Sequence, residues 1–304
     1  MTTVWHMINV AKTYFADSVC VHVCDTNRRE LVPAAMMADY YYQVPGFAEE
    51  GYYAHMLDLM ESNDIDVIIP LIDNDLFIWS CDNTDLVRHK IRSTGAPLAT
   101  VKTLSNKRRM HDALCALNIP TPTIIDPRQM ENGREYIIKS EVGCGSQGVR
   151  VIRKTNDVPV ELPDDTVIQE KCDGKTCEVT AEVFNSQSML KVFCRRRIAT
   201  KAGVCVKAEP VDIPEITEYI RNLTAHIQCP SAFCAQFLMH RGQWNMIDCN
   251  LRLGAGTALS SAAGFQLVRA FWADVCGIEV EEKWLIPDPA VKTMLRVYEE
   301  LVTR

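Results

Sequence analysis

The sequence predicts an α/β unit followed by an α+β unit in a chain of 304 residues. The first unit is predicted by continuous apolar runs that alternate with helical periodicities, because such runs are typical of parallel strands buried on both faces. The second is predicted by residues 232–239 and 243–250, where apolar and polar side chains alternate as in an antiparallel strand pair. A chain of this length typically forms two or three structural units.

The elements of the α/β unit lie in the first 75 residues. Apolar side chains recur at helical spacing over residues 1–15, and a continuous apolar strand at 19–24 ends at Asp25. Ligands of open α/β sheets bind beyond the carboxyl ends of strands. Asp25, Asp73 and Asp75 occupy such ends, although helix capping and turn formation explain them equally well. The further elements expected are a short helix start at 33–38, a strand at 40–44, a helix at 51–63 and a strand at 65–72.

A basic helix begins the second unit. Residues 95–99 read as a linker, and Ser105 is expected to cap a helix that runs to about residue 117. Lys107, Arg108 and Arg109 in its first turn oppose the helix dipole unless an anion neutralises them, so they indicate a phosphate or, alternatively, a solvated basic face. The later elements expected are strands at 167–174, 178–184 and 189–198, a loop at 201–209, the hairpin at 232–250 with its turn at 240–242, and a helix at 262–276.

A glycine-rich loop lies between two β-forming segments at 136–138 and 149–152. Glycines allow close backbone approach to a ligand, and consecutive N–H groups in such a loop bind phosphate oxygens. The pattern is neither a Walker A motif nor a Rossmann fingerprint, since a strand follows the loop. A phosphate-binding lid and an ordinary hairpin turn both remain open interpretations. The residues of this candidate site are Lys139, Gly143, Gly145, Ser146 and Gly148.

Oxygen-bearing side chains alternate along the second hairpin. Gln236, Asp248 and Asn250 have period-two spacing, so they can point to one face, and Arg252 follows. Hard oxygen ligands of this kind suit Mg²⁺ bound together with a nucleotide phosphate. The alternative is an internal hydrogen-bond network, because buried polar groups are costly unless they are satisfied.

The bulk composition limits the classes of function. Hydrophobic residues are 47% of the chain and charged residues 23%, as in a soluble globular protein. A net charge of −7 gives a nucleic-acid partner no electrostatic support. The N-terminus lacks a signal-peptide pattern, and no apolar stretch reaches membrane-spanning length. The sequence therefore predicts a cytoplasmic protein with neither a nucleic-acid nor a membrane partner.

The 13 cysteines are scattered, and no Cys-x-x-Cys motif occurs. Zinc binding is one interpretation of the closest pairs, whereas their spacing favours buried free thiols in a reducing compartment. These pairs are Cys20/Cys24, Cys172/Cys177 and Cys229/Cys234.

The order of these segments resembles the ATP-grasp superfamily, and within it the carbamoyl-phosphate-synthetase-large-subunit-like branch of carboxylate–amine ligases. The residues 139–149 match Lys-Pro-x-x-Gly-x-Gly-Ser-x-Gly-Val with Ser140 in place of proline, and 247–252 match Ile-Glu-x-Asn-x-Arg with Asp248 in place of glutamate. The remaining matching segments are Asn106-Lys107 for Asp-Lys, 167–170 for the hinge strand, 178–184 for the Glu-led strand, and 195–198 with Gly203 for an Arg-x-Arg strand.

The resemblance implies a fold of two domains. Residues 1–100 would form an α/β domain, a truncated doubly wound parallel sheet that lacks the family's usual first strand. Residues 101–304 would form an α+β ATP-grasp domain of two lobes, a nucleotide lobe at about 120–170 and a metal-binding catalytic lobe at about 171–304. A homo-oligomer, or a partner protein that completes the N-terminal domain, is expected from the missing strand.

The resemblance also implies a reaction, in which ATP and Mg²⁺ (or Mn²⁺) activate a small-molecule carboxylate as an acyl phosphate for attack by an amine. Phosphorylation without ligation, and a nucleotide-binding regulatory subunit with little turnover, are the alternatives; a metal-binding structural protein would leave Lys139 unexplained. Substrate selectivity is expected in the loops around Asp25, Asp73 and 201–209. The implied residues are Lys107, Lys139, Gly143, Gly145, Ser146, Gly148, Gln169, Glu170 and Glu178 for the nucleotide, Gln236, Asp248 and Asn250 for the metal, and Arg252, Arg197 and Lys139 for catalysis.

Overall fold

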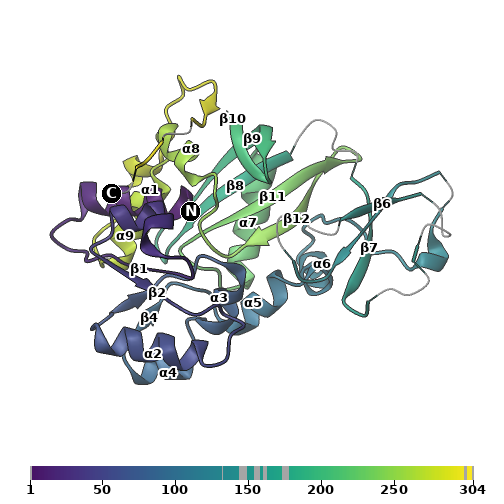
Figure 1. Cartoon of the computed structure of the whole chain (residues 1–304). Helices are drawn as coiled ribbons and strands as arrows, with labels where there is room; N and C mark the ends of the chain where they lie inside the picture. The colour runs from purple at the N-terminus through teal and green to yellow at the C-terminus, as the bar shows by residue number, and fades with distance from the viewer. Residues whose placement is uncertain are drawn as a thin grey trace.

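The computed structural model describes residues 2–131, 133–143, 149–153, 158–159, 163–172, 178–297 and 300–302. An α/β N-terminal domain with parallel strands precedes an α+β domain of two lobes, as the sequence predicts. The larger lobe contains a six-stranded sheet, here called the central sheet, and the smaller contains a three-stranded sheet, here called the small sheet. The small sheet projects from the rest of the molecule on the right of Figure 1.

The N-terminal domain contains two separate pairs of parallel strands. β1 (His22–Asp25) pairs with β2 (Tyr40–Gln43), and β3 (Val67–Ile68) pairs with β4 (Arg92–Ser93). The strands are shorter than the apolar runs that predicted them, because the ends of those runs pack as irregular segments. The helices of this domain are α1 (Thr2–Tyr14), η1 (Arg29–Leu31), η2 (Pro33–Met36), α2 (Tyr52–Ser62), α3 (Asp73–Ile78) and α4 (Thr84–Arg88).

Two helices join the domains. α5 (Leu98–Leu104) begins at the end of the segment expected as a linker and buries Val101 and Leu104. α6 (Lys107–Ala116) is capped by Asn106 rather than by the expected Ser105. The Asn106 side-chain oxygen accepts hydrogen bonds from the main-chain N–H of Arg108 at 3.1 Å and of Arg109 at 3.0 Å, whereas Ser105 ends α5. Two candidate caps stand side by side, and the geometry of the preceding helix selects the second.

The small sheet has the strand order β6-β5-β7, with β5 (Tyr136–Ser140) antiparallel to β6 (Arg150–Ile152) and β7 (Thr166–Glu170). The predicted strand at 167–174 therefore ends at Glu170. Tyr136, Ile138 and Ile152 form its buried core together with Ile168. A short 3-10 helix, η3 (Pro127–Gln129), leads into it.

The central sheet is antiparallel in the order β12-β11-β8-β9-β10-β13. One face is apolar and packs on α7 (Pro214–His226), which the sequence reading missed. The apolar side chains of β8 and β11, such as Val179 and Phe237, meet Ile216, Ile220 and Leu223 of that helix. The strands are β8 (Glu178–Asn185), β9 (Leu190–Lys201), β10 (Val204–Val211), β11 (Ala232–His240), β12 (Gln243–Asn250) and β13 (Met294–Leu295).

Two predictions in this lobe are wrong. The expected loop at 201–209 is mostly strand β10, because Ala202 and Gly203 form a tight turn with φ of 49° and 77° that returns the chain at once. The helix expected at 262–276 starts later than predicted, as α9 (Leu267–Val275), because a separate helix, α8 (Thr257–Ala262), ends just before it. Gly264 has a φ of 90°, and the N–H of Phe265 donates to the carbonyl of Ser260, so α8 ends in a Schellman motif.

The N-terminal helix packs on the C-terminal part of the chain, where α1, α8 and α9 cover one end of the central sheet (Figure 1). The indole N–H of Trp272 on α9 donates to the carbonyl of Met7 at 2.9 Å. A further 3-10 helix, η5 (Glu282–Leu285), packs against α9. None of the helices that the structure describes is both long and apolar enough to cross a membrane.

Candidate functional site

One face of the central sheet is polar although most of it is buried. Strand register places Thr180 opposite both Arg195 and Gln236, and Gln236 opposite Asp248. Side chains at period-two spacing share a face, so the face opposite α7 collects polar and ionisable groups from four strands. They are Glu178, Thr180, Glu182, Arg195, Arg197, Cys234, Gln236, Asp248 and Asn250.

The three predicted metal ligands lie together on this face. Gln236 and Asp248 are direct cross-strand partners, and the register shifts immediately after Gln236. The side-chain amide of Asn250 donates to Asp248 Oδ2 at 3.0 Å. One carboxylate and two amide oxygens form a hard donor set that fits Mg²⁺ better than a soft transition metal.

A lysine already satisfies the Asp248 carboxylate. Lys107, the first residue of α6, extends its ammonium group to Asp248 Oδ1. The lysine side chain is 9% exposed and the aspartate side chain 28% exposed, so this is a partly buried ion pair between residues 141 positions apart. Together with Asn250, it engages both carboxylate oxygens of Asp248. The candidate metal position therefore attracts a cation, and Lys107 supplies one.

Lys139 lies near this pair but differs from Lys107. It is on β5, and burial lowers its pKa to about 8, with the Lys107 ammonium as the second cause and Asp248 opposing the shift. Within the described residues, no salt bridge compensates the burial of its ammonium group. A buried cation of this kind is stabilised by an anion that binds beside it.

Two further arginines of the candidate site are paired with carboxylates. Arg197 Nη1 donates to Glu178, and Arg197 Nη2 donates to the carbonyl of Gly203 at 2.7 Å. Arg252 Nε donates to Asp73 at 2.8 Å. Glu178, a predicted nucleotide-binding residue, is thus bound to a predicted catalytic arginine, and the second arginine is bound to the N-terminal domain.

The three aspartates predicted at strand ends have different roles. Asp25 accepts the main-chain N–H of Asn27 at 2.9 Å, which is the turn role. Asp75 accepts the hydroxyl of Tyr52 at 2.9 Å, and burial raises its pKa. Of the three aspartates, Asp73 alone contacts a predicted site residue within the described part of the chain, and that residue is Arg252.

The hinge-strand residues are engaged by the protein through their side chains. Gln169 donates to the carbonyl of Pro122 at 3.3 Å, and Glu170 accepts from Arg241 at 2.9 Å and Arg134 at 3.4 Å. Glu170 therefore connects the small sheet to the β11–β12 turn, a role that the sequence reading missed because these arginines carry no local signal.

The predicted glycine loop is only partly described. Gly143 is exposed, and a Cβ there would meet nothing within 4 Å. Gly145, Ser146 and Gly148, and with them the expected lid, lie outside the described residues.

A buried ion pair on the polar face was also missed. Arg195 Nη2 donates to Glu182 at 3.2 Å, and the side chains are 3% and 0% exposed. The guanidinium lies so close to Gly256 that a Cβ there would be 1.9 Å from Arg195 Nη2. The period-two alternation of β8 and β9 contains the signal for this pair, since both residues fall on the face of Thr180.

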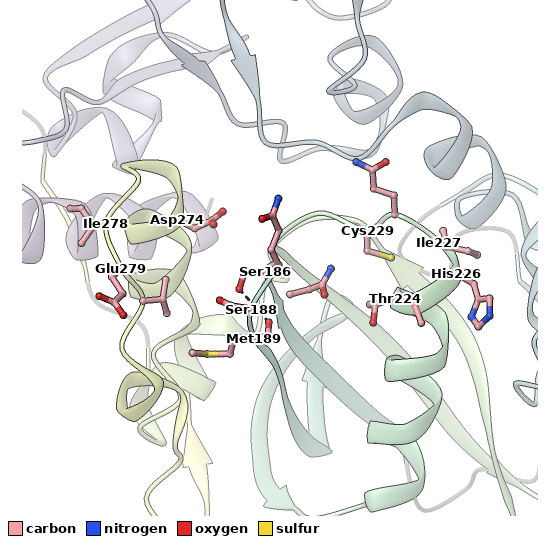
Figure 2. A pocket seen from close by; sticks show the side chains of 15 residues that line it. Ser186, Ser188, Met189, Thr224, His226, Ile227, Cys229, Asp274, Ile278 and Glu279 are labelled. Atoms are coloured by element: carbon pink, nitrogen blue, oxygen red, sulfur yellow. Dashed lines mark hydrogen bonds between the residues drawn. The ribbon is translucent and has the colours of Figure 1, made fainter.

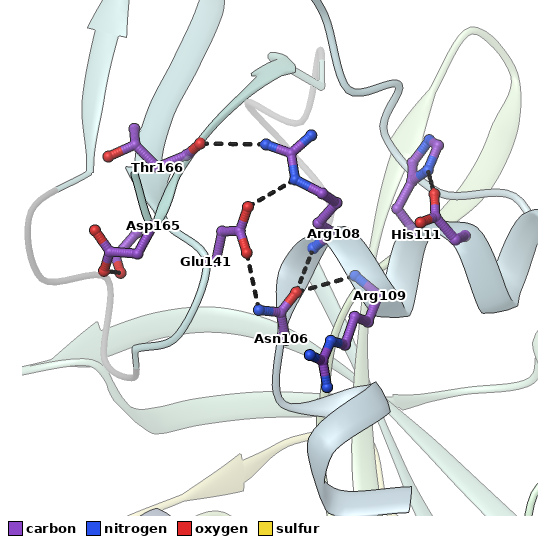
Figure 3. A network of polar contacts seen from close by, with 9 residues as sticks. Asn106, Arg108, Arg109, His111, Glu141, Asp165 and Thr166 are labelled. Carbon is purple, nitrogen blue, oxygen red and sulfur yellow. Dashed lines mark hydrogen bonds and ion pairs between the residues drawn. The ribbon is translucent and has the colours of Figure 1, made fainter. Parts of the chain in front are cut away.

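A polar network joins α6 to the small sheet (Figure 3). The Glu141 carboxylate, just after β5, accepts from Asn106 at 2.9 Å and from Arg108 Nε at 2.6 Å. The main-chain N–H of Lys107 donates to the Glu141 carbonyl at 2.8 Å. Arg109, in the same basic turn, is exposed. The basic first turn is therefore neutralised by internal carboxylates at Lys107 and Arg108.

A cavity of about 1050 Å³ lies away from these groups. The β8–β9 turn, the C-terminal end of α7 and residues 274–280 line it (Figure 2). None of the predicted site residues lines it.

A model described as an ATP-grasp domain matches residues 104–256, and one described as a PylC-like N-terminal domain matches residues 4–91. No protein of curated function matches the sequence.

Solved structures share the fold at low identity. Pyruvate carboxylase from Rhizobium etli has a TM-score of 0.74 at 17% identity, over 94% of this chain and 29% of that one. The biotin carboxylase domain of Hydrogenobacter thermophilus 2-oxoglutarate carboxylase, solved with MgADP, ADP and bicarbonate, has a TM-score of 0.74 at 14% identity. The match covers 96% of this chain and 70% of that one. The Staphylococcus aureus N5-carboxyaminoimidazole synthetase has a TM-score of 0.73 at 15% identity, over 92% of this chain and 76% of that one.

Proposed function

The chain belongs to the ATP-grasp family, and from this membership we propose that it is an ATP- and Mg²⁺-dependent ligase that joins a small-molecule carboxylate to an amine through an acyl phosphate. One structural neighbour, the biotin carboxylase domain from Hydrogenobacter thermophilus, was solved in complex with MgADP, which is consistent with this proposal.

One observation carries the proposal. Asp248, with Asn250 beside it and Gln236 opposite, holds a cation on a polar sheet face, and that cation is the lysine expected to bind phosphate. The Asp248 carboxylate, its two neighbouring amides, and the two lysines and two arginines near them have little value as a stable core, because buried charges cost free energy unless they are paired. The same groups suit a site where phosphate charge and a divalent ion arrive together.

The proposed reaction has two steps. A carboxylate oxygen of the first substrate attacks the γ-phosphorus of ATP, the bond to the β-phosphate oxygen breaks, and ADP leaves. The amine nitrogen then attacks the acyl carbon, inorganic phosphate leaves with the bonding pair, and the nitrogen loses a proton to water. No protein nucleophile takes part, so positioning and electrostatics provide the catalysis.

The side chains have separate roles in this scheme. Lys107 and Lys139 hold the nucleotide phosphates, and Arg197 and Arg252 stabilise charge on the transferred phosphoryl group. Gln169 and Glu170 lie at the adenine edge, and Glu178 contacts the ribose. Gln236, Asp248 and Asn250 hold the metal ion. When bound, Mg²⁺ supplies positive charge that neutralises the phosphate oxygens.

A nucleotide-binding subunit with little turnover is the second candidate, and Asp248 favours it. Aspartate is one methylene shorter than the glutamate of the family pattern, and both of its oxygens are engaged by Lys107 and Asn250. Phosphorylation of a carboxylate without ligation is a third candidate that shares the first step of the scheme.

The test is release of phosphate and ADP from Mg·ATP with a panel of carboxylates and amines, with hydroxylamine added to trap acyl phosphate. We expect turnover in the wild type and its loss in Asp248→Asn, which removes charge at nearly constant shape, while circular dichroism stays unchanged. Asp58→Asn, an exposed carboxylate on α2, serves as the matched control.

The outcomes separate the candidates. Hydroxamate formation without amine-dependent phosphate release indicates phosphorylation alone. Nucleotide binding without turnover, with activity gained in Asp248→Glu, indicates the regulatory subunit. Wild-type turnover in Asp248→Asn contradicts the assignment of this strand to the metal.

A further inference from the structure

The Arg252 guanidinium is held from one side by a residue of the N-terminal domain. Its Nε donates to Asp73 Oδ1 at 2.8 Å, across 179 positions of sequence. The two side chains are 21% and 33% exposed, so water screens the ion pair only in part. Asp73 also opposes the effect of burial on Arg252 and raises its pKa, with Cys234 and Asp248 among the further causes. Asp73 is therefore the carboxylate that contacts Arg252 directly.

The contact with Asp73 leaves the two Nη nitrogens of the guanidinium available to donate to an anion. Arginine has five N–H donors in a rigid planar fork, and Asp73 engages the Nε donor. In the described part of the chain, neither Nη nitrogen has a protein partner. Fixing Nε restricts rotation of the plane, so the two Nη groups are presented to an anion in one orientation.

Both partners stand on segments that pack against each other. Residues 69–71, just before Asp73, and residues 251–253 line a common small cavity. Leu76 of α3 is 2% exposed and belongs to the same core cluster as Leu251. The distance between Asp73 and Arg252 is thus fixed by side-chain packing on either side of the ion pair.

This pair differs from the other two in the site. In the Lys107–Asp248 and Arg197–Glu178 pairs, both members are proposed to contact the nucleotide or the metal ion. Those pairs must therefore separate when the nucleotide and the metal bind. Asp73 belongs to neither set, and its contact with Arg252 can persist.

We propose that Asp73 is a positioning residue, through which the N-terminal domain orients Arg252 toward the transferred phosphoryl group. The proposal rests on the proposed function, because it assigns Arg252 to that group. It predicts that Asp73 strengthens binding of the transition state, in which charge develops on the phosphoryl group, and has little effect on the affinity for the ground-state nucleotide.

The experiment compares two probes by calorimetry in the presence of Mg²⁺: ADP alone, and ADP with aluminium fluoride, which imitates a phosphoryl group in transfer. For Asp73→Asn we expect the Kd of ADP to stay within about twofold and that of the ADP–fluoride complex to rise about tenfold or more. Asp73→Glu should recover part of the loss, and Asp58→Asn should match the wild type. A merely structural role for Asp73 would weaken both probes together.

A double variant completes the test. Arg252→Gln should lose the analogue at least as strongly, and Asp73→Asn combined with Arg252→Gln should lose no more than Arg252→Gln alone, because Asp73 acts through Arg252. Additive losses, or an analogue affinity unchanged by Asp73→Asn, overturn the proposal while leaving the proposed function intact. A wild type that binds ADP and its fluoride complex equally overturns the proposed function and this inference with it.

Discussion

Three of the four predicted cations of the candidate site are bound to carboxylates, and the fourth forms no ion pair with the described residues. The pairs neutralise charge that would otherwise be buried alone, at a cost of several kcal/mol per ion. When a cation leaves its carboxylate to bind a phosphate, that carboxylate loses its positive partner and becomes available to a metal ion. Nucleotide binding and metal binding must therefore be coupled. The pairs are Lys107–Asp248, Arg197–Glu178 and Arg252–Asp73, and the fourth cation is Lys139.

Lys139 gives the site a pH dependence. Its pKa is lowered to about 8, chiefly by burial and then by the Lys107 ammonium, so above that pH the free protein presents a neutral amine. A phosphate bound beside it favours the charged form, so binding takes up a proton above about pH 8. We expect the Kd of Mg·ATP to be level from about pH 7 to about pH 8, then to rise by up to about tenfold per pH unit.

Calorimetric titrations across this range measure the effect. Lys139→Arg keeps its charge at every pH used, so its Kd should remain level. A wild-type Kd that stays constant up to about pH 9.5 would show that Lys139 does not face the phosphates.

Lys107 competes with the metal for Asp248. Since its ammonium occupies Asp248 Oδ1 without nucleotide, free Mg²⁺ or Mn²⁺ must displace it, and with phosphate absent the lysine has no alternative partner. We expect Lys107→Met to bind Mn²⁺ alone about tenfold more tightly than the wild type, because a like charge is removed. The same variant should bind Mg·ATP more weakly, because a phosphate contact is lost. Electron paramagnetic resonance of free Mn²⁺ measures the first effect and calorimetry the second.

Arg109→Met is the matched control, because Arg109 is in the same helical turn but exposed. If Lys107→Met and the wild type bind Mn²⁺ equally without nucleotide, Lys107 does not occupy the metal position.

At the scale of single elements, the sequence pattern predicted those strands and turns whose conformation depends on neighbouring residues. The hairpin of β11 and β12 follows from alternation, and its turn has φ of 50° at Arg241 and 77° at Gly242, which fixes the register next to the turn. A shift of register between Gln236 and Phe237, which leaves Ile247 without a partner residue on β11, then brings Gln236 opposite Asp248. Short helices such as α5, of seven residues, have too few turns to show a period. The ion pairs of Asp248 and Arg252 join positions 141 and 179 residues apart, and no local signal encodes them.

The turn from β12 into α8 depends on a glycine. A Cβ at Gly256 would lie 1.9 Å from Arg195 Nη2 and 2.3 Å from its Cζ, and that guanidinium is buried against Glu182. We expect Gly256→Ala to lower the free energy of unfolding by about 1–3 kcal/mol, the usual range for overpacking in a closed core. Chemical denaturation measures it.

Gly143→Ala provides the comparison, since a Cβ there meets nothing within 4 Å and should change stability by less than about 0.5 kcal/mol. Equal stability of the two variants would mean that Arg195 moves aside without cost.

At the scale of the whole molecule, the candidate site combines three parts of the fold. Asp73 comes from the N-terminal domain, Lys139 from the small sheet and Asp248 from the central sheet, with Lys107 on the helix between the last two. Function in such an arrangement depends on how firmly the parts are held to one another.

Glu141 is the main link between the small sheet and α6 (Figure 3). Its carboxylate accepts from Asn106 and Arg108, and its carbonyl accepts the N–H of Lys107 at 2.8 Å. Because α6 carries Lys107 and β5 carries Lys139, this link sets the separation of the two lysines. We expect Glu141→Ala to raise the Kd of Mg·ATP several-fold, by roughly 1 kcal/mol, the worth of one partly exposed charged contact. Hydrogen exchange at the Lys107 amide should become faster, because the small sheet that supplies its acceptor is less firmly held.

Glu135→Ala is the control that separates this link from a general loss of stability. Glu135 pairs with Arg153 and Lys171 beside the small sheet, and within the described residues its carboxylate forms no ion pair with α6. It should therefore change the stability of the small sheet without changing exchange at Lys107. If both variants weaken ATP binding equally, the small sheet acts through its own stability. If only Glu141→Ala does, the orientation of the small sheet on α6 determines how the two lysines meet the phosphates.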